Sequence, residues 1–214
     1  KVPYFEDYAR RYTDLPMLVR LRKDGERWVP DRYLRQSDLP GAPASDSAAW
    51  KTVAFAEESG EPVVPQGSMG YSWPKEGEPE GRWNLEEKDG ESSKPVRLTL
   101  SAIDRQDKVV LVAFPYFGGR PHERFNENDQ GGDVLTRNVP VRRVALADGE
   151  AYVASVFDLL CANYGLDRGI GGACAKGFDD NVPYTPAWQE PITGVAADKV
   201  TALARGFAEN AEKT

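Results

Sequence analysis

One histidine and two cysteines are the side chains of this chain with the widest chemical repertoire. His122 lies in the charged run 120–124 (RPHER). The adjacent Glu123 is expected to point elsewhere, so no orienting carboxylate is predicted beside the histidine. Cys161 and Cys174 stand outside any CxxC or CxxH spacing, which argues against a zinc or iron–sulfur site. We therefore predict a solvated histidine, two small buried or unreactive thiols and no metal ligand. A disulfide between the two cysteines stays open.

Paired carboxylates and glycine-rich segments are the remaining candidates for chemistry. Glu86-Glu87 and Asp179-Asp180 are the acidic pairs, but a general acid and base are defined by their separation in space, which the sequence does not give. Glycines cluster at 118–119, 131–132 and 169–172. None of these clusters follows a strand and opens a helix with the spacing of a phosphate-binding loop. We predict solvated turns at the acidic pairs and ordinary loops at the glycines, and no catalytic residue.

The charge balance excludes one class of partner. The chain has 214 residues, with 27 Lys+Arg against 34 Asp+Glu and a formal net charge of -7. A nucleic-acid-binding protein needs a clustered basic face, which this acidic chain lacks. Basic residues gather only at Arg10-Arg11 with Arg20, Arg22 and Lys23, and at Arg137 with Arg142 and Arg143. Both clusters are interrupted by apolar residues, so we predict salt-bridged surface rather than an anion site.

The sequence contains no long apolar run of the kind that spans a membrane, and no signal peptide is recognised. The chain begins Lys-Val-Pro without an initiator Met and stops shortly after a strong helical pattern. These ends are typical of one module of a longer chain, and we expect the 214-residue chain to be an internal piece that is soluble by itself.

The first third of the chain predicts a helix and a hairpin. Residues 3–12 place aromatic side chains on one helical face after a first-turn proline. Residues 17–21 form a strand, and the turn at Asp24-Gly25 returns the chain through 27–29. Residues 37–49 are rich in Ser, Pro and Ala and predict a loop.

Short strands follow through the middle of the chain. Alternating patterns predict strands at 50–55, 62–64 and 95–100, and the unbroken apolar run 109–114 predicts a strand buried on both faces. Residues 74–82 and 118–133 are polar or glycine-rich, and we expect exposed loops there.

The last third is the best specified. The dipeptide Asp148-Gly149 joins two apolar strands, 139–146 and 151–156, which is the strongest hairpin signal in the chain. A helix over 158–164 should end at Gly165. Thr185 precedes Pro186 as a helix cap, a break is expected at Pro191, and Thr193-Gly194 should end this short helix. A second helix opens at 197 or 198. Its apolar stripe steps by three and four residues through Val200, Leu203, Ala204, Phe207 and Ala208.

These elements together predict an α+β fold of short, mixed or antiparallel strands and hairpins with a few helices, ending in an amphipathic helix. Taken alone they leave the function unreadable.

The amino-acid sequences of several stretches resemble the alpha subunit of membrane-bound respiratory nitrate reductases. The similar runs are 12–19 (YTDLPMLV), 50–55 (WKTVAF), 82–90 (RWNLEEKDG), 114–119 (FPYFGG), 138–143 (NVPVRR) with 146–149 (LADG), 162–166 (ANYGL) and 184–188 (YTPAW). Residues 192–195 (ITGV), with the helix that follows, resemble a segment shared by the wider molybdopterin oxidoreductase superfamily. The matches cover essentially the whole chain and weaken only at 37–49, 74–81 and 118–133, where loops are predicted.

This resemblance implies a much longer catalytic subunit with the larger molybdopterin oxidoreductase fold. Such a subunit holds molybdenum on two molybdopterin guanine dinucleotide cofactors, with one [4Fe–4S] cluster nearby. It reduces nitrate to nitrite by oxygen-atom transfer. The implied partners are the rest of the alpha subunit, an iron–sulfur beta subunit and a haem-containing membrane gamma subunit, with the complex on the cytoplasmic face of the bacterial cell membrane. Within it, 1–36 would be a helix and hairpin that join the core, 37–138 a β-rich insertion, and 139–214 the hairpin and helices of the superfamily core.

No catalytic, cofactor-binding or metal residue is carried over onto this sequence. The family's cluster ligands and its aspartate ligand to molybdenum belong to earlier segments. Asp14, Tyr116 and Phe117 are predicted, from position, to lie near the site or its channel. We therefore expect a scaffold fragment that is inactive alone. The alternatives are a fragment of a related reductase of chlorate, perchlorate or selenate, or a stand-alone binding module.

Overall fold

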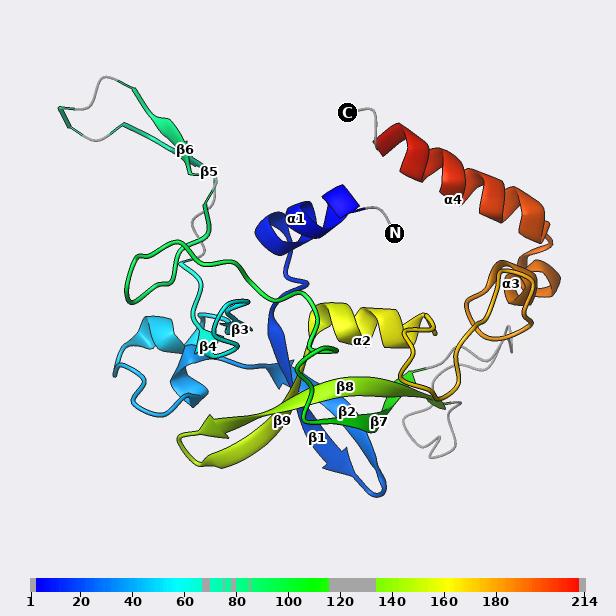
Figure 1. Cartoon of the computed structure of the whole chain (residues 1–214), viewed down its shortest axis with the longest axis horizontal. Coiled ribbons are helices and arrows are strands. Elements are labelled where there is room, and N and C mark those ends of the chain that lie inside the picture. The colour runs from blue at the N-terminus through cyan, green and yellow to red at the C-terminus, as the bar shows by residue number, and fades with distance from the viewer. Residues whose placement is uncertain are drawn as a thin grey trace. The chain divides into compact units, whose positions relative to one another are not determined.

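The computed structural model describes residues 3–66, 70–74, 76–77, 80–84, 86–115 and 134–211. Its strands are β1 (Leu18–Asp24), β2 (Arg27–Tyr33), β3 (Ala54–Phe55), β4 (Pro62–Val63), β5 (Gly70–Ser72), β6 (Arg82–Asn84), β7 (Lys108–Pro115), β8 (Val134–Leu146) and β9 (Gly149–Ser155). Its α-helices are α1 (Pro3–Tyr12), α2 (Val156–Asn163), α3 (Pro186–Thr193) and α4 (Ala197–Ala211), with short 3₁₀ turns at Gln36–Asp38 and Asp46–Ala49. Figure 1 shows these elements. The predicted α+β class, with its hairpins and final helix, is confirmed.

A closed five-stranded barrel, in the order β1-β2-β7-β8-β9, forms the centre of the fold. The β1–β2 hairpin turns at Gly25, whose φ of 61° suits a glycine, and pairs Arg22 with Val29. The predicted hairpin at Asp148-Gly149 is confirmed. β8 and β9 pair antiparallel, from Arg142 opposite Val153 to Leu146 opposite Gly149 at the turn. β9 then closes the barrel by pairing antiparallel with β1. Two small sheets, β3–β4 and β5–β6, lie outside the barrel.

The main core cluster joins the barrel to the segment that follows its first hairpin. Barrel residues Leu18, Val144 and Val153 pack with the buried Val53 and Phe55. Burial alternates at the end of β8, where Val144 and Leu146 are buried and Arg143 and Ala145 are exposed.

Three strand predictions need correction. Residues 50–55 form a strand only at Ala54–Phe55, because Trp50 lies in a turn and Thr52 makes only an isolated bridge to Arg35. Residues 95–100 alternate in burial as predicted, but they form no continuous strand, because their backbone groups pair with two different segments: Val96 N–H donates to Glu87, and Thr99 N–H donates to Phe55. The prediction that 109–114 is buried on both faces is also wrong. Leu111 is 44% exposed, since one face of β7 is open at that position.

The helix ends follow the sequence signals. Gly165, with φ of 69°, terminates α2, and the Thr185 hydroxyl accepts a hydrogen bond from Trp188 N–H at the start of α3. The predicted end of α3 at Thr193-Gly194 is confirmed, with Gly194 in the left-handed conformation. The break predicted at Pro191 does not occur, because α3 continues through that residue.

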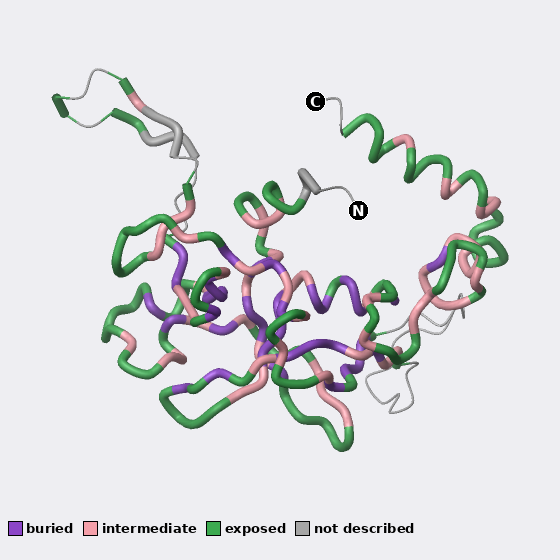
Figure 2. Tube along the Cα trace, in the orientation of Figure 1, coloured by how far each residue is buried: buried purple, intermediate pink, exposed green. Residues whose placement is uncertain are grey.

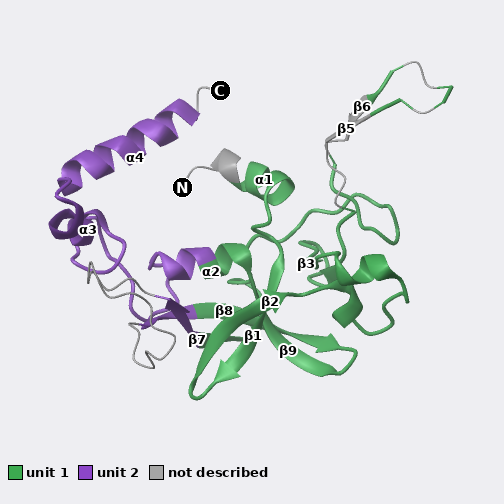
Figure 3. Ribbon diagram, turned by 180° about the vertical axis from the view of Figure 1, so that it is seen from behind, with its two compact units in different colours: residues 1–110, 139–159 green, residues 111–138, 160–214 purple. Residues whose placement is uncertain are grey.

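The chain divides into two compact units (Figure 3). Unit 1 comprises residues 1–110 and 139–159, and unit 2 comprises 111–138 and 160–214. The boundary between the units falls within β7, β8 and α2, so each of these three elements contributes residues to both units. Among the described residues, no helix is long and apolar enough to cross a membrane.

Candidate functional site

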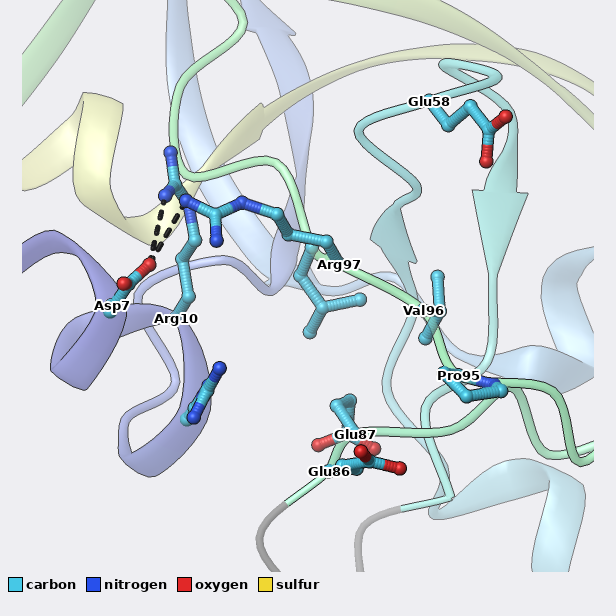
Figure 4. Close-up of a pocket in the computed structure, with 10 residues that line it drawn as sticks. Asp7, Arg10, Glu58, Glu86, Glu87, Pro95, Val96 and Arg97 are labelled. Carbon is cyan, nitrogen blue, oxygen red and sulfur yellow. Dashed lines mark hydrogen bonds and ion pairs between the residues drawn. The ribbon is translucent and has the colours of Figure 1, made fainter.

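A charged cleft of about 400 Å³ lies in unit 1 (Figure 4). One wall comes from α1, and the other comes from the segments around 86–87 and 95–98. The lining side chains are those of Asp7, Arg10, Arg11, Glu58, Glu86, Glu87, Pro95, Val96, Arg97 and Leu98. Arginines and carboxylates thus share the cleft.

A closed ring of ion pairs lies at the edge of this cleft. Arg97 contacts Asp7 at 2.9 Å and Glu57 at 2.5 Å. Arg10 contacts the same two acids, each at 3.5 Å. Asp7 and Arg10 belong to α1, whereas Glu57 and Arg97 come from the body of unit 1, so the ring fastens the helix to that body. The side chain of Arg10 is only 13% exposed, which shields its share of the ring from solvent.

The cleft offers charge but no nucleophile among its described lining residues. In Figure 4, Glu86 and Glu87 stand apart from the group formed by Asp7, Arg10 and Arg97. Opposite charges largely offset one another here, so the arrangement supports attachment of α1 rather than acid–base chemistry. Glu86 is exposed, as predicted for a solvated turn, whereas Glu87 is half-buried at the cleft wall.

The outcome differs among the arginines of the two predicted clusters. Arg10 and Arg20 of the first cluster form ion pairs, as predicted, and so does Arg143 of the second, which contacts Glu150 at 3.4 Å. Arg137 is buried, and its guanidinium lies so close to Gly165 that a Cβ there would approach it within 3.1 Å. The half-buried Arg142 reaches the ring of buried Phe55 at 4.3 Å and donates to Gly60. A surface position is therefore the wrong prediction for Arg137.

Asp14 has a structural partner in the described structure. Its carboxylate accepts a 2.5 Å hydrogen bond from the hydroxyl of Tyr33. That hydrogen bond, with partial burial, raises the pKa of Tyr33 to about 12. Asp14 therefore ties the turn before β1 to the end of β2. Its predicted place near a site or channel is untested, and Tyr116, Phe117 and His122 lie outside the described residues.

The other candidates occupy loops. The Asp180 carboxylate accepts hydrogen bonds from Lys176 N–H and Gly177 N–H, which makes it a turn residue as predicted. The glycines of 169–172 include three with positive φ, which fits an irregular loop. Cys161 is buried, Cys174 is half-buried, and neither belongs to a disulfide. The described residues contain no cluster of three or more His, Cys, Asp or Glu side chains that could hold a metal ion.

Sequence reasoning missed a buried carboxylate in unit 1. Asp158, at 0% exposure, accepts hydrogen bonds from Ser101 Oγ at 2.7 Å and Ala102 N–H at 2.8 Å. Asp158 N–H donates in turn to Ser155 Oγ. The sequence predicts that Asp158 lies in the first turn of a helix. It does not predict the hydrogen-bond partners of Asp158, because they lie more than fifty residues earlier in the chain and no local pattern indicates the contact.

Asp38 is an acid whose ionised form the fold favours. Burial opposes its charged form, but a bidentate pair of hydrogen bonds from Arg32, at 2.7 and 2.8 Å, and another from Arg35 N–H outweigh burial and lower the pKa of Asp38. A second arginine, Arg20, lies 3.5 Å away. The carboxylate thus holds β1 and β2 to the 3₁₀ turn that follows them.

We expect Asp38→Asn to destabilise the chain near neutral pH and to lose that effect in acid. Because the folded pKa lies below that of the unfolded chain, about 3.9, the stabilisation is present above that value and disappears as pH falls through the folded pKa. Urea denaturation of both proteins between neutral pH and pH ~3 measures the difference. A constant difference across that range would contradict the assignment.

Known proteins of one kind match this chain along its length. It is 47% identical, over 99% of its residues, to the respiratory nitrate reductase 1 alpha chain of Escherichia coli (strain K12), of which it covers 17%. It is 37% identical, over 98% of its residues, to the nitrate reductase alpha chain of Bacillus subtilis and 38% identical, over its full length, to the nitrate reductase alpha subunit of Mycobacterium tuberculosis, covering 16% of each. No family model matches.

These relatives are all nitrate reductase alpha chains, and this chain spans only 16–17% of their length. More particularly, the chain corresponds to a segment of a respiratory nitrate reductase alpha chain, which confirms the resemblance.

Proposed function

We propose that this chain is a scaffold segment of the catalytic subunit of a respiratory nitrate reductase, and that it has no activity alone. The observation that carries the proposal is similarity over 98–100% of the chain to alpha chains of which it covers only 16–17%. A stand-alone binding module would not be expected to match such alpha chains from end to end. We also propose three segments within the subunit: 1–36 joins its core, 37–138 is a β-rich insertion, and 139–214 belongs to the superfamily core.

In the full-length protein we propose that nitrate is reduced to nitrite at molybdenum bound by two molybdopterin guanine dinucleotides, with a [4Fe–4S] cluster as electron donor. We propose no residue of this chain as a cofactor ligand and route no step of the reaction through it. Its contribution is structural: a barrel, a buried carboxylate and an ion-paired helix that support the neighbouring parts of the subunit.

An iron–sulfur beta subunit and a haem-containing gamma subunit are the proposed partners of the full-length protein, on the cytoplasmic face of the cell membrane. The two partners are proposed because the relatives are named as respiratory alpha chains, and an alpha chain implies a complex of several subunits.

Dye-linked turnover tests the proposal. We expect the full-length protein, supplied with a reduced viologen dye, to convert nitrate to nitrite, and the purified 214-residue chain to convert none while retaining a folded circular dichroism spectrum. Chlorate, perchlorate and selenate are the comparison substrates. Turnover by the 214-residue chain would refute the scaffold role. If the full-length protein preferred another oxyanion, nitrate would be the wrong proposed substrate.

A further inference from the structure

One end of the barrel in unit 1 carries a group of aromatic and basic side chains. Trp28 of β2 and Tyr152 of β9 lie edge to face, with ring centroids 5.3 Å apart. The ammonium group of Lys108, on β7, lies 4.0 Å from the centre of the Tyr152 ring and 5.8 Å from that of the Trp28 ring. The ammonium group of Lys23, on β1, lies 5.3 Å from the Trp28 ring. We name these four residues the basic barrel end.

Strand geometry places this group at the end of the barrel interior. Side chains two residues apart point to the same face of a strand. Lys108 therefore shares its face of β7 with the buried Val110 and Val112, and Tyr152 shares its face of β9 with the buried Ala154. Four strands of a closed barrel bring side chains together on the inner side, since side chains on the outer side diverge. The group lies beside the turns of the two hairpins, which Figure 2 shows as exposed.

The two ammonium groups of the basic barrel end are not neutralised by nearby acids. Neither forms an ion pair with a residue that the structure describes. Asp24, next to Lys23 in sequence, contacts Arg27 at 3.5 Å. The Asp107 carboxylate, next to Lys108, accepts a hydrogen bond from a backbone N–H at 2.6 Å. Each ammonium group thus keeps its N–H donors for an outside acceptor, and because two like charges held close together repel, an anion would bind favourably between them.

We propose that the basic barrel end is a contact surface for an acidic segment of a separate protein subunit. Carboxylates of that segment would meet Lys23 and Lys108, and the rings of Trp28 and Tyr152 would supply apolar contact. The inference rests on the proposed function in one respect, that this chain belongs to an alpha chain that works in a complex with other subunits.

Charge and composition together favour this kind of partner. The chain as a whole has a formal net charge of -7, so a basic surface is a local exception on it. Aromatic residues are enriched in protein interfaces, and complementary charges set partner choice and association rate. Ordering a free lysine side chain opposes binding, but contact with the Trp28 and Tyr152 rings already restrains these two lysines.

Zero-length cross-linking tests the partner without any substitution. A carbodiimide joins a lysine amine to a carboxylate that it already contacts. In the complex purified with the full-length alpha chain, we expect mass spectrometry to find peptides that join Lys23 or Lys108 to an Asp or Glu of another subunit. Lys51, which is exposed on unit 1, is the internal control and should form no such link. Links only within the alpha chain, links between two copies of it, or no link at all would each overturn the inference.

A matched pair of charge reversals measures the effect of the surface on assembly. Lys108→Glu reverses a charge within the basic barrel end, and Lys51→Glu reverses one elsewhere on unit 1. At low salt we expect K108E to slow association of the full-length alpha chain with the other subunits about 10-fold, whereas K51E and K108R associate at the wild-type rate. Equal slowing by K108E and K51E would reflect net charge alone and would overturn the inference. Neither experiment depends on nitrate turnover, so the proposed function can stand if this inference fails.

Discussion

Phe55→Ala should lower the free energy of unfolding of the chain by about 3–5 kcal/mol. Phe55 is 3% exposed, packs in the main core cluster, and carries the Arg142 guanidinium 4.3 Å from its ring. Truncation removes the buried ring, leaves a cavity and deprives a partly buried cation of its aromatic partner. Urea denaturation followed by tryptophan fluorescence measures the loss.

Phe55→Leu is the matched control. It keeps most of the apolar volume but removes the cation–π contact, so its cost should be clearly smaller than that of Phe55→Ala. Equal costs for the two variants would mean that the interaction with Arg142, rather than cavity formation, dominates at this position.

Asp158→Ala should cost about 2–4 kcal/mol, because it deprives buried groups of a charged acceptor. The Ala102 amide, which donates to Asp158, would be left buried, and the Ser101 hydroxyl would lose the same acceptor. The loss would release the segment around 101–102 from the start of α2. Faster hydrogen exchange at the Ala102 amide, together with a lower unfolding midpoint in urea, is the expected signature.

Asp158→Asn serves as its control, since the amide retains one oxygen acceptor in nearly the same shape. We expect an intermediate loss of stability and partial protection of the Ala102 amide. If the Ala102 amide exchanged at the wild-type rate in Asp158→Ala, the carboxylate would not be what holds this segment.

Local features of this fold could be predicted from the sequence, whereas distant pairings could not. The Asp148-Gly149 hairpin, the Thr185 cap and the Gly165 helix end depend on neighbouring residues and are correct. Residues 95–100 show the limit: their alternating burial was readable, but the destination of their backbone hydrogen bonds was not.

The ion pairs of the charged cleft could not be predicted from the sequence either. Arg10 belongs to a basic cluster that is visible in the sequence, but Glu57 and Arg97, which complete its ion-pair ring, carry no local signal. Their side chains meet only because the chain returns to α1 after long excursions. Asp158 is similar, because a carboxylate in the first turn of a helix is ordinary until its buried partners are known.

The closure of the barrel has a consequence for how the chain is made. β1 forms a hairpin with β2 at the start of the chain, but its other edge pairs with β9, near residue 155. During synthesis this edge emerges long before its partner, and an unpaired strand edge attracts other strands. Contacts so distant in sequence also slow folding. The early hairpin is thus exposed to misassembly in the nascent chain until β9 has been translated.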